Sequence, residues 1–519
     1  MRPDDQVGPL FRVRAYPVIG WWEALTCDRM PNENTAMPTE SQSYQNPLVK
    51  RYASAEMLRI FSDDNRYRTW RRLWLALAES EAELGLDISE AQLDELRAHL
   101  DDIDYDRVAE HESELRHDVM AHIKTFGEAC PSAAGIIHLG ATSCYVTDNA
   151  DCILNRQALE LVRSKLARLL GALERFALEY KELPALAYTH FQPAQLTSVG
   201  KRAAIWAQDL LLDLKEVQFR LDGLRFRGVK GTTGTQASFL RLFDGDTDKV
   251  EALDEMVTKK MDFEARFRVT GQTYTRKQDE ATLHALSGLA QSAHKISNDV
   301  RLLQRLGEME EPFETRQVGS SAMPYKRNPM RMERVSSLAK FVICEAQNGA
   351  WVHSTQWFER TLDDSANRRL SIPQSFLGID AILILMVNVV EGLVVYPEVI
   401  QRILKQEFDL MVSENLMMLA VKAGGDRQEL HECIRDHAME VVQARRGGDD
   451  NADLLLRLAE DPLFESVREN ISEVSDPADY IGCSAAQVER FFAEEVRPAL
   501  ELCGSGGDDS DASSWDVRV

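Results

Sequence analysis

Residues 319–329 form the stretch of the chain whose side chains are best suited to chemistry. They read Gly-Ser-Ser-Ala-Met-Pro-Tyr-Lys-Arg-Asn-Pro and lack the apolar spacing of 3.6 or 2 residues that a core helix or strand requires. Two hydroxyl side chains, Ser320 and Ser321, precede three cations: Lys326, Arg327 and Arg331. Such a set suits removal of a proton beside a developing anion. A solvated surface loop has the same composition, so residue types alone leave both interpretations open.

Two further polar motifs contain histidine. His190 lies in Thr-His-Phe-Gln-Pro, directly before a helix that we expect to begin at Pro193, where an imidazole could contact a ligand or only cap the helix. His117 and His122 are five residues apart in the chain, whereas zinc-binding helices space two histidines by four. We therefore expect no metal at this second motif.

Other basic, amide and hydroxyl residues occur close to expected helix boundaries. Their plain interpretation is helix capping or a solvated surface, and we expect Thr147 or Asp148 to be the N-cap of a long helix. The glycine-rich stretch 228–235 lacks the spacing of a Walker phosphate loop. The polar candidates are Arg51, Tyr52, Arg116, His117, Asp118, Thr142, Ser143, Gln272, Asn328, Arg334, Arg360, Ser365 and Arg369.

Five long segments with apolar residues at helical spacing must position these side chains. Few strand signals accompany them, so the sequence predicts an all-α fold with three helical domains and a central elongated bundle of long helices. Several of the helices exceed what an ordinary core requires, which indicates contacts with other subunits. The segments cover about residues 154–180, 193–224, 277–306, 329 onward and 369–393.

Composition shifts along the chain predict five regions. We expect a flexible N-terminal extension, which mixes Pro, Arg, Trp and acidic residues without the apolar stretch of a signal peptide. We also expect a flexible Gly/Ser/Asp tail, because it cannot bury enough apolar surface to order itself. The regions are the extension at 1–45, an N-terminal helical domain at 46–142, the bundle and oligomerisation core at 143–395, a C-terminal helical domain at 396–503 and the tail at 504–519.

The loop at 319–329 resembles the signature loop of the fumarase/aspartase superfamily, whose members eliminate fumarate from a substituted succinate. Tyr325 and Arg327, followed by Met-Arg-x-Glu-Arg at 330–334, make it similar in particular to the eukaryotic type of the adenylosuccinate lyase family. Similar matches recur from residue 51 to residue 500. The resemblance implies the long-helix bundle of that superfamily and a homotetramer whose active sites are shared between subunits.

The resemblance also implies roles for the matching side chains. Ser320 would take a proton from the succinyl carbon with support from Lys326, and His190 would protonate the departing nitrogen. Glu333 would orient His190, since a carboxylate partner favours the charged imidazole. The reaction would be β-elimination of fumarate from adenylosuccinate to give AMP and from SAICAR to give AICAR, in purine biosynthesis. The polar candidates named above would bind substrate.

Charge and cysteine content restrict the class of protein. A formal net charge of −24 over 519 residues disfavours a nucleic-acid backbone as partner. Eight cysteines without a CxxC pair indicate reduced thiols and a cytoplasmic protein. We find no unbroken run of about 18 apolar residues and expect no membrane partner. The sequence gives no reason to expect a cofactor.

Three alternatives stay open at this point. Argininosuccinate lyase has another version of the loop, and its substrate needs no phosphate clamp. A non-catalytic, crystallin-like structural protein of the same superfamily is disfavoured by the presence of both Ser320 and His190. A nucleic-acid-binding module is disfavoured by the net charge.

Overall fold

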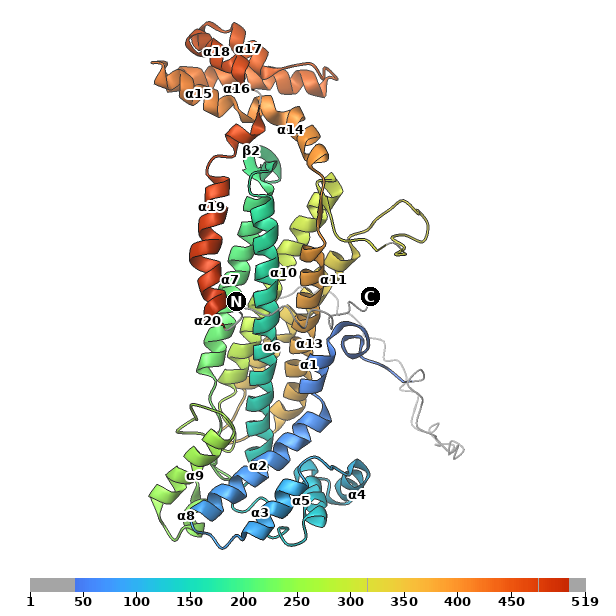
Figure 1. Cartoon of the computed structure of the whole chain (residues 1–519), viewed down its shortest axis with the longest axis vertical. Coiled ribbons are helices and arrows are strands. Elements are labelled where there is room, and N and C mark those ends of the chain that lie inside the picture. The colour runs from blue at the N-terminus through green and yellow to red at the C-terminus, as the bar shows by residue number, and fades with distance from the viewer. Residues whose placement is uncertain (1–42, 315, 475, 504–519) are drawn as a thin grey trace, which may run out of the picture. The chain divides into compact units, whose positions relative to one another are not determined.

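A computed structural model describes residues 43–314, 316–474 and 476–503 (Figure 1). The chain from Pro47 onward forms one compact unit, distinct from the segment that ends at Asn46. The all-α prediction is confirmed, because helices make up 69% of the structure and strands 4%. Nearly all of the predicted N-terminal extension and all of the predicted tail lie outside the described residues.

Five long helices run side by side within the compact unit (Figure 1). Helix α6 packs on α7 and α13, and α10 packs on α7, α11 and α13. Their facing sides bury the apolar stripes that predicted them, so most of the core lies between these helices. Their bounds are α6 Ser143–Glu179, α7 Val199–Gly223, α10 Lys277–Leu306, α11 Met330–Glu345 and α13 Asp363–Glu391.

Helix α13 is long and apolar enough to cross a membrane by length and composition. Polar residues interrupt its apolar sequence, so it contains no unbroken apolar run of the length that a membrane span needs. In the structure 83% of its most apolar window is buried, as in the central helix of a bundle. Asp380 on α13 accepts a hydrogen bond from Lys165 of α6, and this fully buried ion pair joins the two helices.

Three predicted helix starts are wrong. Helix α6 begins at Ser143 after Thr142, so neither Thr147 nor Asp148 is its N-cap. Asp148 is instead buried inside the helix, where Arg276 from a distant segment neutralises it. Polar residues are acceptable in a helix interior when they find such a partner, which local sequence cannot show. Helix α13 begins at Asp363, ahead of the expected position 369, and α11 begins one residue after Pro329.

The predicted helix start at Pro193 is also wrong, because residues 184–198 form a β-hairpin. Strand β1, Pro184–Thr189, pairs antiparallel with β2, Gln192–Ser198, and Thr189 lies opposite Gln192. Proline's fixed φ suits the first turn of a helix but also an edge strand, so it did not distinguish the two. Helix α7 follows the hairpin, with the Ser198 side chain accepting from the Lys201 N–H at 3.1 Å.

Shorter helices precede, interrupt and follow the five. One group packs against the main core: α1 Ala55–Ile60, α2 Asp63–Glu83, α3 Glu90–Ala98, α5 Asp118–Ala129, α8 Ala237–Leu242, α9 Thr247–Lys260, α14 Pro397–Met411, α19 Ser484–Phe491 and α20 Arg497–Leu502. Helix α4, Tyr105–Leu115, packs on α5. A second hydrophobic core holds most of the later ones. These are α15 Ser413–Lys422, α16 Arg427–Arg446, α17 Leu454–Glu460 and α18 Arg468–Glu473. The short strands β3 Met309–Glu310 and β4 Val394–Val395 pair with each other elsewhere.

Candidate functional site

Six of the predicted site residues gather where α6 begins, and we call them the helix-start cluster: His117, Asp118, Ser143, Gln272, Arg360 and Arg369. The Ser143 hydroxyl lies 3.4 Å from Nε2 of His117. Arg369 donates to the Asp118 carboxylate at 2.8 Å across 251 residues of sequence. Gln272 receives a hydrogen bond from the Cys144 thiol, and its backbone N–H donates to Glu359 O at 3.0 Å, beside Arg360. The fold therefore brings together residues from four separate sequence motifs.

Helix starts explain why the local sequence places these side chains at one point. Arg116 ends α4 in the left-handed conformation, with φ of 54°, and turns the chain so that His117 caps α5. Nδ1 of His117 accepts from the Met120 N–H at 3.4 Å, which leaves Nε2 toward Ser143. Thr142 is the N-cap of α6. Two helix N-termini thus direct their positive dipole ends toward this point, which favours an anionic ligand.

Electrostatics keep the carboxylate of the cluster ionised. Burial opposes ionisation of Asp118, but the hydrogen bonds from Arg369 and from the Val119 N–H outweigh it, so the pKa of Asp118 is lowered. The Arg369 side chain is 61% exposed and still presents donors to solvent. The cluster is therefore a charged, accessible surface and not a neutral core contact.

A buried ion network beneath the cluster was missed by the sequence analysis. Arg276 donates to Asp364 at 2.7 Å and to Asp148 at 3.0 Å, and Asp364 also accepts from Arg360 at 3.3 Å. Arg368 points inward to Asp279, whereas its neighbour Arg369 points outward. From the sequence, Arg360, Arg368 and Arg369 were predicted to lie in one turn region. Only their burial in the structure shows that Arg368 is part of the core and that Arg369 is exposed.

His190 lies at the tip of the hairpin, in its two-residue turn with Phe191. Both residues have positive φ, 53° and 58°, as a tight type I′ connection requires. Both are exposed, Phe191 at 59%. Residues with such strained backbones are uncommon outside turns and functional sites, so the imidazole is displayed to solvent at a fixed position.

His190 and the helix-start cluster lie at opposite ends of α6. Ser143 is the first residue of this helix, and the hairpin that carries His190 follows its last turn. A helix of 37 residues is about 55 Å long at 1.5 Å per residue. A single chain therefore does not bring the imidazole and the cluster into one site.

The Ser320 hydroxyl is held by the backbone of its own loop. Its oxygen accepts from the N–H groups of Ala322 at 3.3 Å and Met323 at 3.1 Å. A Cβ at Gly319 would lie 2.2 Å from the Lys326 carbonyl oxygen, so only glycine permits this close approach. Asn328 bridges the loop by donating to Gly319 O at 2.8 Å. Two N–H groups aimed at one oxygen would stabilise negative charge on it.

The remaining candidates occupy other positions. Lys326 is exposed in the Ser320 loop, and Ser365 is half-buried near the start of α13. The Arg334 guanidinium lies 5.5 Å from the ring centre of Tyr52, next to the exposed Arg51. In the part of one chain that the structure describes, Glu333 is exposed and forms no ion pair with His190. The predicted histidine–carboxylate pair is thus not formed within a single chain.

A buried carboxylate fixes the end of the Ser320 loop. Glu311, 2% exposed, accepts from the backbone N–H groups of Arg331 and Met332 at 3.1 Å each, in the first turn of α11. Burial raises the pKa of Glu311 despite these two N–H bonds. Glu308, just before β3, contacts Tyr188 of β1 at 3.3 Å. The loop therefore starts on the same side of the bundle as the His190 hairpin.

Replacing Glu311 by alanine should loosen the Ser320 loop. Two buried N–H groups would lose their acceptor, at a cost of about 1–3 kcal/mol, which corresponds to a roughly five- to 150-fold faster amide hydrogen exchange at Arg331 and Met332. Glu314→Ala is the matched control, because its side chain is 72% exposed and its ion pair with Arg331 contributes little. Unchanged exchange in Glu311→Ala would show that the carboxylate does not hold the loop.

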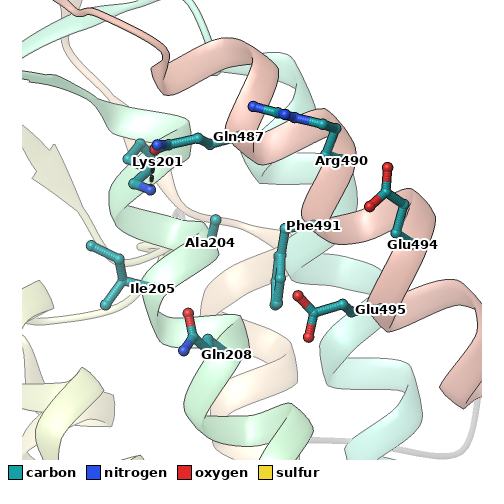
Figure 2. A pocket seen from close by; sticks show the side chains of 9 residues that line it. All are labelled: Lys201, Ala204, Ile205, Gln208, Gln487, Arg490, Phe491, Glu494 and Glu495. Carbon is teal, nitrogen blue, oxygen red and sulfur yellow. Dashed lines mark hydrogen bonds between the residues drawn. The ribbon is translucent and has the colours of Figure 1, made fainter.

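A groove of about 330 Å³ lies between α7 and the helical segment 484–496 (Figure 2). Lys201 and Gln487 form a hydrogen bond across it, and Phe491 lies between the helices. Its side chains carry both charge signs and include none of the predicted site residues. We assign it no part in the chemistry.

Comparisons with known proteins agree with the motifs that the fold exposes. The profile of a family described as lyase matches residues 50–344, and that of the adenylosuccinate lyase C-terminus matches residues 409–491. An adenylosuccinate lyase of Saccharomyces cerevisiae is 50% identical over 464 residues, which cover 88% of this chain and 96% of the yeast protein. The chain belongs to the adenylosuccinate lyase family. The Schizosaccharomyces pombe and Schistosoma mansoni members are 48% and 47% identical over 88% and 89% of this chain.

Membership makes the chain a carbon–nitrogen lyase of the fumarase/aspartase superfamily, as the loop motif predicted. Solved structures agree on the fold. A 3-carboxy-cis,cis-muconate lactonizing enzyme from Pseudomonas putida superposes with a TM-score of 0.76 at 22% identity, covering 88% of this chain and all of that one. A fumarate lyase from Mesorhizobium superposes with a TM-score of 0.74 at 21% identity, covering 87% of this chain and all of the other.

Proposed function

We propose that the chain releases fumarate from adenylosuccinate to give AMP, and from SAICAR to give AICAR, in the cytoplasm. The observation that carries the proposal is the Ser320 hydroxyl, whose oxygen accepts two backbone N–H bonds inside its own loop. A serine hydroxyl is a poor base in water, and these two donors, with Lys326 nearby in sequence, favour its alkoxide. The relatives named above support the choice of substrate.

The reaction needs a base and an acid on opposite sides of the bond that breaks. Ser320 takes the proton from the succinyl carbon next to a carboxylate, and His190 protonates the purine nitrogen as it departs. The electrons of the broken C–H bond form the double bond of fumarate, and those of the C–N bond stay on the nitrogen. Glu333 orients His190 from another subunit, since the two do not pair within one chain.

The charge of the substrate is opposite to that of the cations in two groups of residues. Adenylosuccinate carries a phosphate and two carboxylates, and the helix-start cluster offers Arg360 and Arg369 with two helix N-termini. Arg51, Tyr52 and Arg334 form a second basic-aromatic group for the nucleotide. The protein as a whole has a net charge of −24, so these local groups of cations are the places where a multiply anionic ligand would bind. Arg116, His117, Asp118, Thr142, Ser143, Gln272, Asn328 and Ser365 would complete the contacts.

The active site requires several copies of the chain. His190 and the helix-start cluster are about 55 Å apart along α6, so copies must lie antiparallel to bring them together. An apolar stripe on α7 offers the surface for this contact: Ile205, Leu212 and Phe219 recur every seven residues and are 46%, 59% and 62% exposed. A homotetramer of long helices would cover this stripe and assemble the shared sites.

Fumarate release from adenylosuccinate tests the proposal directly. The purified chain should convert adenylosuccinate to AMP with an equal amount of fumarate, and should act on SAICAR in the same way. Argininosuccinate should not be cleaved, because it has no phosphate for the basic groups to bind. Absence of turnover on adenylosuccinate and SAICAR would instead favour a non-catalytic structural role.

The phosphate contact has its own test in Arg360→Ala. Losing one charge-assisted contact should cost about 1.5–3 kcal/mol, or roughly ten- to over a hundred-fold in binding adenylosuccinate. Dephosphorylated succinyl-adenosine should be affected far less, because it lacks the group, and the two ligands with two enzymes form a double-mutant-type cycle. Arg427→Ala is the control, because Arg427 is an exposed arginine at the start of α16, outside the proposed site. Equal losses for both ligands would show that Arg360 does not contact the phosphate.

A further inference from the structure

Three potential metal ligands meet in the second hydrophobic core, outside every residue proposed for the lyase reaction. Cys433 and His437 are four residues apart on α16, so both project from the same face. Asp461 faces them from the junction between α17 and the short helix 462–467. One ligand atom from each of the three lies within 4.8 Å of the other two.

We propose that Cys433, His437 and Asp461 bind a zinc ion. A thiolate sulfur, an imidazole nitrogen and a carboxylate oxygen are the ligand types that Zn²⁺ prefers, and soft sulfur selects against Mg²⁺ and Ca²⁺. Tetrahedral zinc with its usual bond lengths separates such ligands by about 3.3–3.6 Å. Nε2 of His437 and Oδ2 of Asp461 are already 3.0 Å apart, so only small side-chain movements are needed to admit the ion.

The carboxylate is held ready by its own backbone. Oδ1 of Asp461 accepts from the Leu463 N–H at 2.9 Å, which leaves Oδ2 facing His437. Metal sites characteristically fix their ligands through such outer hydrogen bonds. Binding would release the thiol proton of Cys433, and the resulting thiolate and the Asp461 carboxylate would balance the two charges of the ion.

Partial exposure gives the ion a route in and a fourth ligand. The three residues are half-buried, with His437 and Asp461 side chains 27% and 21% exposed. Three protein ligands leave one tetrahedral position for water. The ion would join α16, which contributes Leu430 and Val441 to the second core, to the junction after α17, where Phe464 enters the same core. It would therefore stabilise this core without taking part in fumarate release.

The sequence analysis missed this site because only two of its ligands are close in sequence. Cys433 and His437 have the four-residue spacing of a metal-binding helix, but a cysteine and a histidine alone predict little. The third ligand follows 24 residues after His437 and is brought back by the turn between α16 and α17.

Metal titration of the full chain without a histidine tag tests the inference. After removal of metal with a chelator, equilibrium dialysis should give one Zn²⁺ per chain, and Co²⁺ should produce the sulfur charge-transfer band and the intense visible bands of a tetrahedral thiolate site. Cys433→Ser and His437→Ala should each weaken Zn²⁺ binding at least ten-fold and abolish the cobalt spectrum. Asp461→Asn should weaken binding while keeping the cap on the following helix.

Two controls keep the result specific. Cys483→Ser removes an exposed thiol outside the site, and His431→Ala removes an exposed histidine of the same helix as His437. Neither change should alter the stoichiometry. Zinc should also raise the thermal midpoint of the wild type but not of Cys433→Ser. Absence of saturable Zn²⁺ binding, or wild-type binding in Cys433→Ser and His437→Ala, would show that the three side chains form only a hydrogen-bonded contact. Fumarate release is measured in parallel and should be unchanged in these variants.

Discussion

Ser320→Ala and His190→Ala should each lower kcat by ~10²–10⁴ or more while leaving substrate binding largely intact. The two groups act only while bonds break, so their loss raises the barrier without removing ground-state contacts. In Ser320→Ala the N–H groups of Ala322 and Met323 lose the oxygen that they contact at 3.3 and 3.1 Å. Single-turnover release of fumarate from bound adenylosuccinate measures the chemical step apart from binding.

Ser321→Ala is the matched control for the base. Its hydroxyl belongs to the same loop and is exposed, but the two backbone donors converge on Ser320. Ser321→Ala should therefore keep most of the activity. Turnover close to that of the wild type in Ser320→Ala or His190→Ala would remove the altered residue from the mechanism, and a larger loss in Ser321→Ala would transfer the base to the second hydroxyl.

Helix periodicity was enough to predict the bundle where one pattern runs without interruption. Helix α10 occupies 277–306 as predicted, because its apolar stripe is continuous and Gly307, with φ of 78°, ends it in the left-handed conformation. Helix α6 was predicted to begin after an N-cap at Thr147 or Asp148, later than its actual start at Ser143, since residues such as Asp148 are typical of helix ends in sequence. Asp148 and its neighbour Asn149 are both buried and bonded to segments far along the chain.

The candidate site likewise has parts that the sequence predicts and parts that it does not. The loop at 319–329 and the motif at His190 could be found in the sequence, because their residue types and spacing are local. The hairpin that carries His190 could not be predicted from the sequence. Its strands depend on pairing between 184–189 and 192–198, and Pro193 in the second strand is also typical of a helix start. The network of Arg276, Asp148 and Asp364 depends on contacts across 88 to 128 residues, which single-sequence periodicity does not contain.

The length of α6 bears on how many chains are needed to form one active site. The helix separates the hairpin from the helix-start cluster by about 55 Å, a distance set by its 37 residues and not by side-chain detail. Each chain therefore contains both the His190 hairpin and the helix-start cluster, but the rigid helix keeps the two apart. In the proposed tetramer, antiparallel packing of neighbouring bundles would restore the complete set at each end.

Mixing two inactive variants should therefore restore activity. Ser320→Ala subunits keep His190, and His190→Ala subunits keep Ser320, so mixed oligomers contain sites with both groups intact. If the two residues of one site come from different chains, random exchange makes about a quarter of the sites complete, which exceeds the activity of either parent by roughly 10² or more.

Subunit exchange is induced by mild denaturation and followed by native mass spectrometry of one isotopically labelled variant. A Ser320→Ala, His190→Ala double variant mixed with wild-type chains provides the control, because it adds chains without adding either functional group. If exchange is verified and the two single variants together stay as inactive as they are alone, Ser320 and His190 of a site belong to the same chain. The apolar stripe of Ile205, Leu212 and Phe219 would then join subunits without sharing their chemistry.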